Sequence, residues 1–134
     1  MRENKRKHLE FIQGVVNRLS TNSFLLKGWS VGLVAALFAL AAKDADTRFL
    51  LLVFVPITIF WGLDGYCLWQ ERLYRALYRH VRLLPEEQAD FCMSTEKVKG
   101  EKGLTWWSAT FSKTVLLFHG ALVFSALIVT YALR

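Results

Sequence analysis

Three long apolar runs dominate the sequence and leave few folds open to it. They cover residues 24–42, 49–69 and 114–133. A helix rises about 1.5 Å per residue, so each run is long enough to cross a hydrocarbon layer about 30 Å thick. Because no water satisfies the backbone inside a bilayer, helices are the spanning structures that fit single apolar runs. The sequence therefore predicts an all-α integral membrane protein with three transmembrane helices.

The first two apolar runs form a predicted hairpin. Six residues, Lys43 to Arg48, join them, which is too few for a separate domain. Two helices joined by so short a loop must be antiparallel neighbours. Pro56 lies within the second run, where it is tolerated because neighbouring groups satisfy the carbonyl that it leaves free.

Residues 1–20 begin with a basic cluster and continue as a predicted amphipathic cytoplasmic helix. Apolar side chains recur there at helical spacing: Leu9, Phe11, Ile12, Val15, Val16 and Leu19. Such a stripe is typical of a helix that lies on a membrane surface, or of one that packs on a neighbour. The polar stretch from Ser20 to Ser23 follows, and its residue types favour helix caps. We therefore expect a helix boundary before the first span.

The second span is expected to continue out of the bilayer as a basic cytoplasmic helix over residues 70–84. Four arginines share one face of it: Arg72, Arg75, Arg79 and Arg82. Apolar side chains share another face: Leu73, Leu77, Val81 and Leu84. The arginine face is most often a belt that contacts lipid phosphates, and less often a surface for a partner or a nucleotide. Residues 85–113 are predicted to be a cytoplasmic loop and an interfacial segment.

The distribution of basic residues predicts the orientation of the spans. Segments 1–27 and 70–113 contain fourteen of the seventeen Lys and Arg residues, and the hairpin loop and C-terminus contain three. Because basic residues accumulate on the cytoplasmic side, we expect a cytoplasmic N-terminus and an external C-terminus.

Asp64 is a carboxylate close to the end of the second span, where a charge is costly unless it has a partner. Lys27 precedes the loop residue Lys43 by sixteen positions, and Asp64 follows the loop residue Arg48 by sixteen. Both therefore lie about 24 Å from the outer loop, and they are predicted to form an ion pair between adjacent helices. The alternative is that Asp64 faces headgroup water, because aromatic residues typical of an interface surround it: Trp61, Tyr66 and Trp69. A proton- or ion-conducting role ranks behind both.

Small residues share one face of the first span: Gly28, Gly32, Ala35, Ala36 and Ala39. Such a face permits close helix approach. We expect it to pack against the second span, with a contact between subunits as the alternative.

His119 lies near the start of the third span, on the same face as Ser108 and Ser112. No acidic residue occurs inside its own helix. We therefore favour a structural hydrogen bond to a Ser or Thr of a neighbouring helix over a place along an aqueous path.

Motifs for catalysis or cofactor binding are missing from the sequence. It contains no Gly-rich phosphate loop, no GxSxG and no HExxH, so we expect no enzyme, no cofactor and no metal site. Cys67 and Cys92 lack metal-site spacing. The net charge of +6 is basic, but no ordered nucleic-acid module appears, so sequence-specific nucleic-acid binding is not expected.

Two stretches, "NSFLLKGW" and "WGLDGYCLWQERLYRALY", carry a resemblance over residues 10–80. They resemble a group of small bacterial inner-membrane proteins with an NSFxLKGW entry and a WxLDxYxLxxERxYRxLY exit from a membrane hairpin. The matching residues are Asn22, Ser23, Lys27, Gly28, Trp29, Asp64, Tyr66, Glu71, Arg72, Arg75 and Tyr78. Such proteins look like the small helical membrane effectors of antiphage systems linked to CRISPR or nucleotide signalling.

The resemblance implies an oligomeric inner-membrane effector that permeabilises the bilayer in antiphage defence. Its expected partners are the lipid bilayer, further copies of the chain, and a soluble defence protein or nucleoprotein at the cytoplasmic face. The alternative is a non-conducting anchor or adaptor that recruits a soluble complex. A small transporter subunit is less favoured, because three spans offer no inverted repeat.

Overall fold

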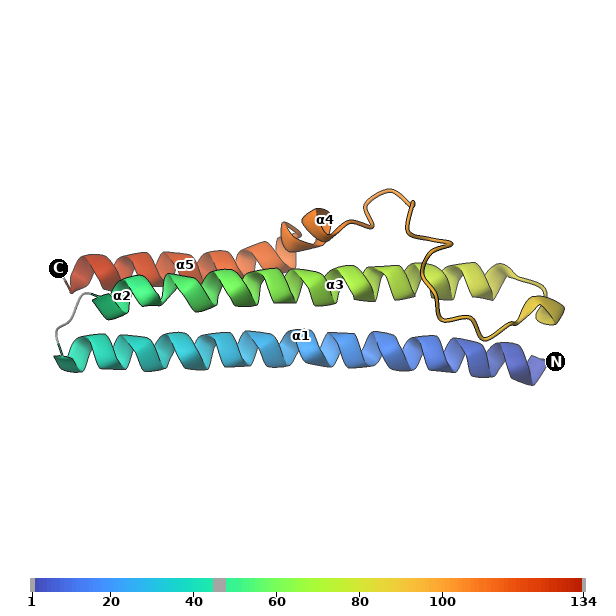
Figure 1. The fold of residues 1–134 in the computed structure, drawn as a ribbon, viewed down its shortest axis with the longest axis horizontal. Helices are drawn as coiled ribbons and strands as arrows, with labels where there is room; N and C mark the ends of the chain where they lie inside the picture. The colour runs from blue at the N-terminus through green and yellow to red at the C-terminus, as the bar shows by residue number, and fades with distance from the viewer. Residues whose placement is uncertain (1, 45–47, 134) are drawn as a thin grey trace.

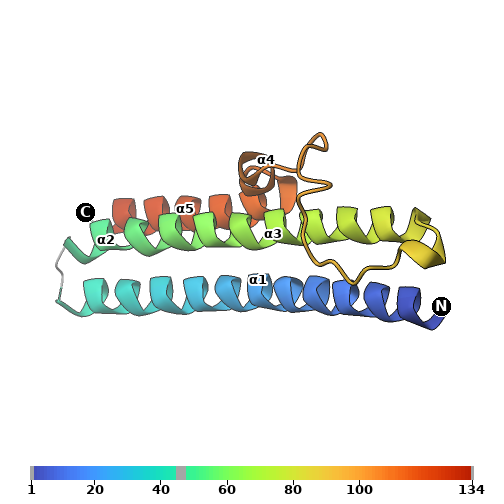
Figure 2. The ribbon, with the colours of Figure 1, turned by 45° about the vertical axis from the view of Figure 1, so that its right-hand side comes forward.

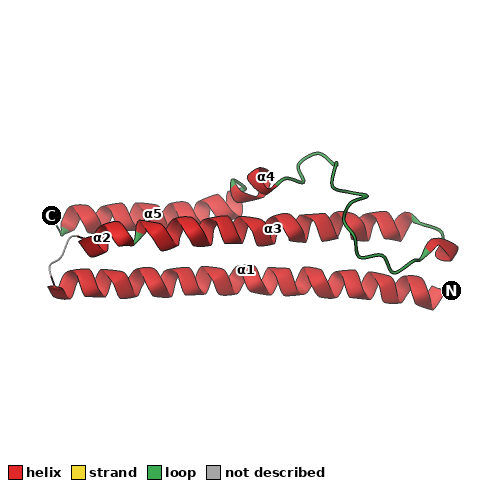
Figure 3. Ribbon diagram, viewed as in Figure 1, coloured by secondary structure: helices red, strands yellow, loops and turns green. Residues whose placement is uncertain are grey.

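The computed structural model describes residues 2–44 and 48–133, and within these ranges every regular element is a helix (Figure 1, Figure 3). The long helices are α1 (Arg2–Asp44), α3 (Phe54–Leu83) and α5 (Lys113–Ala132). The short elements are α2 (Arg48–Leu52), the 3₁₀ turn η1 (Glu86–Gln88) and α4 (Trp106–Thr110). The predicted all-α class is therefore correct for the described residues.

Three helical stretches in the described chain are long and apolar enough to cross a membrane: Arg2–Lys43, Arg48–Leu83 and Lys113–Ala132. Large apolar side chains face outward on them, as Trp29 and Leu117 do with 70% and 77% of their surface exposed. Apolar surface on all sides is typical of helices that contact lipid. The 43 residues of α1 make a helix about 65 Å long, roughly twice the thickness of a hydrocarbon layer.

The long helices form a bundle with a three-helix part and a two-helix part. Helices α1 and α3 lie antiparallel along most of their length, and α5 lies beside the half of α3 that is near the hairpin loop (Figure 1, Figure 2). We call the other half, made of residues 2–22 and 66–83, the stalk. Residues 84–105, the return segment, leave the far end of the stalk and run back along it to α4 (Figure 2).

Each part of the bundle has its own apolar core. In the three-helix part, the buried cluster is Val34, Val53, Ile57 and Ala126. The other cluster lies between the stalk and the return segment: the stalk contributes Ile12, Leu73, Ala76, Leu77 and Val81, and the return segment contributes Val98 and Leu104. Burying one large aliphatic side chain contributes roughly 1.5–3 kcal/mol, so the stalk has a substantial core of its own. The amphipathic N-terminal helix is therefore packed on a neighbour, which was one of the two arrangements expected.

Polar contacts also attach the return segment to α1. His8 is buried, and its Nε2 lies 3.0 Å from the Cys92 carbonyl oxygen. Lys5 donates through Nζ to the Leu84 carbonyl oxygen at 2.8 Å. These bonds satisfy carbonyl groups at places where the chain leaves helical structure.

The helix boundary expected at Ser20 to Ser23 is absent, because α1 continues through these residues. The Thr21 hydroxyl donates within the helix to the Asn17 carbonyl oxygen at 3.0 Å. The Ser23 hydroxyl donates to Asp64 on α3. The low helix propensity of such residues costs only about 0.5 kcal/mol each, which packing against α3 outweighs.

A break does occur in the second span, where α2 ends at Leu52 and α3 begins at Phe54. Pro56 has no N–H to donate to the Leu52 carbonyl four residues earlier. The helical path resumes at once, with the Ile57 N–H bonded to the Val53 carbonyl oxygen at 3.4 Å.

Candidate functional site

A buried charged cluster joins the three long helices, and Asp64 on α3 is its centre. The Asp64 side chain has 0% of its surface exposed. Lys27 of α1 places Nζ 2.6 Å from Oδ2, and His119 of α5 places Nε2 3.0 Å from the same oxygen. The Ser23 hydroxyl donates to Oδ1. One carboxylate therefore binds side chains from both of the helices beside α3.

Helical spacing explains how α1 supplies two of these groups. Ser23 and Lys27 are four residues apart, so they lie one above the other on the same face. Lys27 Nζ also donates to Ser23 Oγ at 2.8 Å. The serine oxygen accepts from the ammonium group while its own hydrogen is directed to Asp64. Lys27 therefore contacts the carboxylate directly and orients a second donor toward it.

Aromatic contacts hold the His119 ring in place. The ring stacks on Trp61, with centroids 5.9 Å apart and planes 5° from parallel. Because the Asp64 carboxylate oxygen accepts a hydrogen bond, Nε2 of His119 is the protonated nitrogen. Nδ1 is buried and has no partner among the described residues.

Helix α4 lies directly against α3 beside the cluster. A Cβ added at Gly65 would lie 2.9 Å from the Thr110 Cα and would clash with the Thr110 hydroxyl. Two indole groups hold this contact: Trp61 Nε1 donates to the Thr110 carbonyl at 3.0 Å, and Trp106 Nε1 donates to the Gly62 carbonyl at 3.1 Å. Glycine at position 65 is therefore required for the close approach of α4 to α3.

Lys27 and Asp64 lie in contact, as the depth comparison from the sequence predicts. The alternative in which Asp64 faces headgroup water is wrong, because neighbouring helices cover its side chain completely. The partner expected for His119 was a Ser or Thr, whereas its partner is the Asp64 carboxylate. Counting along the apolar runs could have found this partner. Asp64 lies five residues before Trp69, the last residue of the second run, and His119 lies five residues after Thr114, the first residue of the third run.

The small-residue face of α1 does not pack against the second span, contrary to the favoured expectation. All five of its residues are exposed: Gly28, Gly32, Ala35, Ala36 and Ala39. A Cβ added at Gly28 or Gly32 would meet no other atom within 4 Å. Lys27 and Gly28 lie about 100° apart around the helix, so they cannot both face α3. The Lys27–Asp64 contact therefore sets the rotation of α1.

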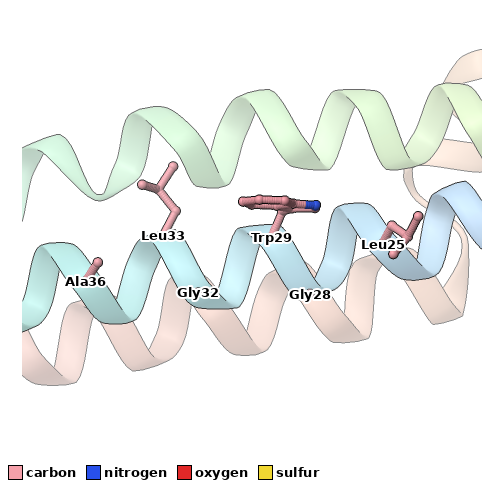
Figure 4. A pocket seen from close by; sticks show the side chains of 6 residues that line it. All are labelled: Leu25, Gly28, Trp29, Gly32, Leu33 and Ala36. Atoms are coloured by element: carbon pink, nitrogen blue, oxygen red, sulfur yellow. The ribbon is translucent and has the colours of Figure 1, made fainter.

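An open apolar groove follows the small-residue face (Figure 4). Its lining residues are Leu25, Gly28, Trp29, Gly32, Leu33 and Ala36. Gly28 and Gly32 form its floor, and the larger side chains form its walls. We call this surface the α1 groove.

The four arginines of the stalk part of α3 have different surroundings. Arg75 donates to Glu71 Oε1 through Nε at 3.0 Å and Nη2 at 2.7 Å. Arg72 Nη1 lies 3.5 Å from Ser108 Oγ, and Arg79 Nη2 lies 3.9 Å from Glu101 Oε2. Arg82 is exposed. The expected arginine face exists, and Glu71 orients one of its members, Arg75. The sequence interpretation missed this pair, although its spacing of four residues indicates it.

The described part of the chain offers no group of side chains suited to bind a metal. No three His, Cys, Asp or Glu side chains gather there as metal ligands. Cys67 and Cys92 are free thiols.

Asp90 accepts the Cys92 N–H at 3.0 Å, and this hydrogen bond holds the pKa of Asp90 below its ordinary value.

Comparison of the chain with protein-family models, with curated proteins and with solved structures gave no match. The residues that the structure describes form a helical bundle with three candidate membrane spans and a charged cluster between them.

Proposed function

We propose that the protein is an oligomeric helical effector of the bacterial inner membrane that permeabilises the bilayer in antiphage defence. Its stalk and N-terminus lie in the cytoplasm, and its C-terminus lies outside. The three apolar helices support insertion, and the excess of basic residues in the stalk and return segment supports this orientation.

The observation that carries the proposal is the uncovered α1 groove. Gly28 and Gly32 are exposed on a helix that is apolar enough to span a membrane. In lipid, helices associate through close backbone packing, and small residues four positions apart provide it. No described helix of the same chain fills this groove, so the matching α1 of a second copy is the occupant that we propose.

A polar face of α1 supports the permeabilising step. Ser23, Lys27 and Ser30 all point into the bundle, and the buried Ser30 hydroxyl has no partner among the described residues. If the three helices separate, this face becomes available to water between subunits. The Asp64 cluster keeps it closed in the resting bundle. The resemblance to small antiphage effectors supports the same function.

A second candidate is a non-conducting anchor that recruits a soluble complex. The stalk favours it, because its own apolar core and the return segment make it a firm cytoplasmic platform. Both functions use the stalk for contact with a soluble defence protein or nucleoprotein, and they differ in what the spans do.

The mass of the detergent-solubilised protein tests assembly. We expect a discrete oligomer for the wild type and smaller species for Gly32→Leu, because leucine fills the α1 groove. Gly120→Leu is the matched control, since an added Cβ there also meets no atom within 4 Å but lies on α5. A wild-type monomer, or an oligomer that both variants retain, would reject assembly through the α1 groove.

A further inference from the structure

A polar pocket of about 230 Å³ lies between α1 and α3 in the stalk. Its lining residues are Gln13, Arg75, Tyr78 and Arg79. We propose that this pocket binds the phosphate groups of a water-soluble phosphorylated ligand. The phosphate site rests on the geometry of the stalk and does not depend on assembly through the α1 groove, whereas the choice of a water-soluble ligand rests on the proposed membrane insertion.

Arg75 is oriented for such a ligand by a largely buried carboxylate. Glu71 is only 9% exposed, and a single oxygen of it accepts both Nε and Nη2 of Arg75. This leaves the Nη1 hydrogens and one Nη2 hydrogen of the guanidinium group for another acceptor. Because Glu71 already holds the planar guanidinium group of Arg75 in one orientation, the side chain loses little conformational entropy when it binds a phosphate.

Arg79 adds a second cation one helical turn further on. Its closest carboxylate contact, Nη2 to Glu101 Oε2 at 3.9 Å, is longer than a hydrogen bond. The Arg79 donors therefore remain available for a ligand. Tyr78 packs against the stalk core and also lines the pocket, which gives the site one firm wall with a hydroxyl group.

The pocket divides the arginine face into two pairs. Arg75 and Arg79 line it, whereas Arg72 is directed to Ser108 and Arg82 lies outside the lining. A surface that only contacts lipid phosphates does not require two of the four arginines to line one pocket together with Gln13 of α1. The grouping favours a specific ligand.

The height of the pocket favours a soluble ligand over a lipid headgroup. With Arg48 at the outer boundary of the hydrocarbon layer, Arg75 lies about 40 Å along the helix and Arg79 about 46 Å. The hydrocarbon layer ends at about 30 Å, and one headgroup layer adds about 5–7 Å. Both Cα atoms therefore lie in water beyond the headgroups.

The test uses the full chain in nanodiscs of neutral phosphatidylcholine, titrated calorimetrically with inorganic pyrophosphate. We expect saturable binding that weakens at least about ten-fold in Arg75→Gln/Arg79→Gln, because two charge-assisted contacts are lost. The matched control, Arg72→Gln/Arg82→Gln, removes the same charge from the same helix and should weaken binding less than about three-fold. Arg79→Gln alone leaves the Glu71–Arg75 pair intact and should weaken binding about five-fold.

Three results would overturn the proposal. One is the absence of saturable pyrophosphate binding to the wild type. Another is an equal loss in the two double variants, which would indicate general attraction to the basic helix. The third is loss of binding when the nanodiscs contain anionic phosphatidylglycerol, because a lipid headgroup would then occupy the pocket. Gly32→Leu should bind pyrophosphate like the wild type, so failure of assembly and failure of this site are distinguishable.

Discussion

Lys27 on α1 and Asp64 on α3 form an ion pair, with Nζ 2.6 Å from Oδ2. The carboxylate is fully buried, and the lysine side chain is 25% exposed. His119 of α5 bonds to the same oxygen, so removal of this one carboxylate would affect the contacts among all three long helices.

Removing one member of the pair should destabilise the bundle. Asp64→Ala leaves the Lys27 charge without its partner, and loss of one member of a buried pair costs about 3–5 kcal/mol. The partial exposure of Lys27 places the expected loss near the lower end of that range. The free energy of unfolding in detergent measures it.

The exchanged variant, Lys27→Asp with Asp64→Lys, should recover part of the stability lost by either single change. Recovery should be incomplete, because His119 would then face an ammonium group instead of a carboxylate. Single changes that leave the free energy of unfolding within about 0.5 kcal/mol of wild type would show that the pair contributes nothing.

His119→Leu should loosen α5 specifically. The change removes one hydrogen bond to a buried carboxylate, which is worth about 1.5–3 kcal/mol, while Ser23 and Lys27 still bind Asp64. Hydrogen exchange should therefore increase in α5 more than in α1. Phe124→Leu is the control, because Phe124 lies on the same helix and is 65% exposed. Equal exchange in the two variants would contradict the anchoring role of His119.

Gly65→Ala should displace α4 from α3. The added methyl group would clash with Thr110, and overpacking of this kind costs about 1–3 kcal/mol. The emission of Trp106, whose indole bonds to α3, should shift to the red as α4 separates. Gly62→Ala is the control, since its added Cβ would lie 3.7 Å from Trp106, an ordinary contact. If both alanine variants keep the wild-type spectrum, α4 does not depend on the close approach at Gly65.

The orientation can be tested with reporter fusions. An alkaline phosphatase domain at the C-terminus should be active, because we expect this end to be external. A fluorescent protein at the N-terminus should be bright. An inactive C-terminal phosphatase, together with a bright C-terminal fluorescent protein, would reverse the proposed topology.

Residue spacing is enough to predict the all-helical class, the candidate spans and the level positions of Lys27 and Asp64. Depth along a helix follows from counting, because the hairpin loop gives both helices a common origin. The rotation of α1 about its axis does not follow from counting, since either its small-residue face or its charged face could pack against α3. The ion pair decides between them. Asp64 and His119 also lie at matching depths, each five residues from the facing ends of the second and third apolar runs. Depth alone does not give the rotation that turns His119 toward Asp64.

Membrane potential in living cells tests the central claim most directly. The protein is expressed with its genomic neighbours, the cells are infected with phage, and potential is followed with a voltage-sensitive dye. The effector proposal predicts that potential collapses in cells with the wild type and with Gly120→Leu, and is maintained with Gly32→Leu. Normal potential in infected wild-type cells, while the protein co-purifies at a fixed ratio with a soluble complex, would contradict the effector and favour the anchor.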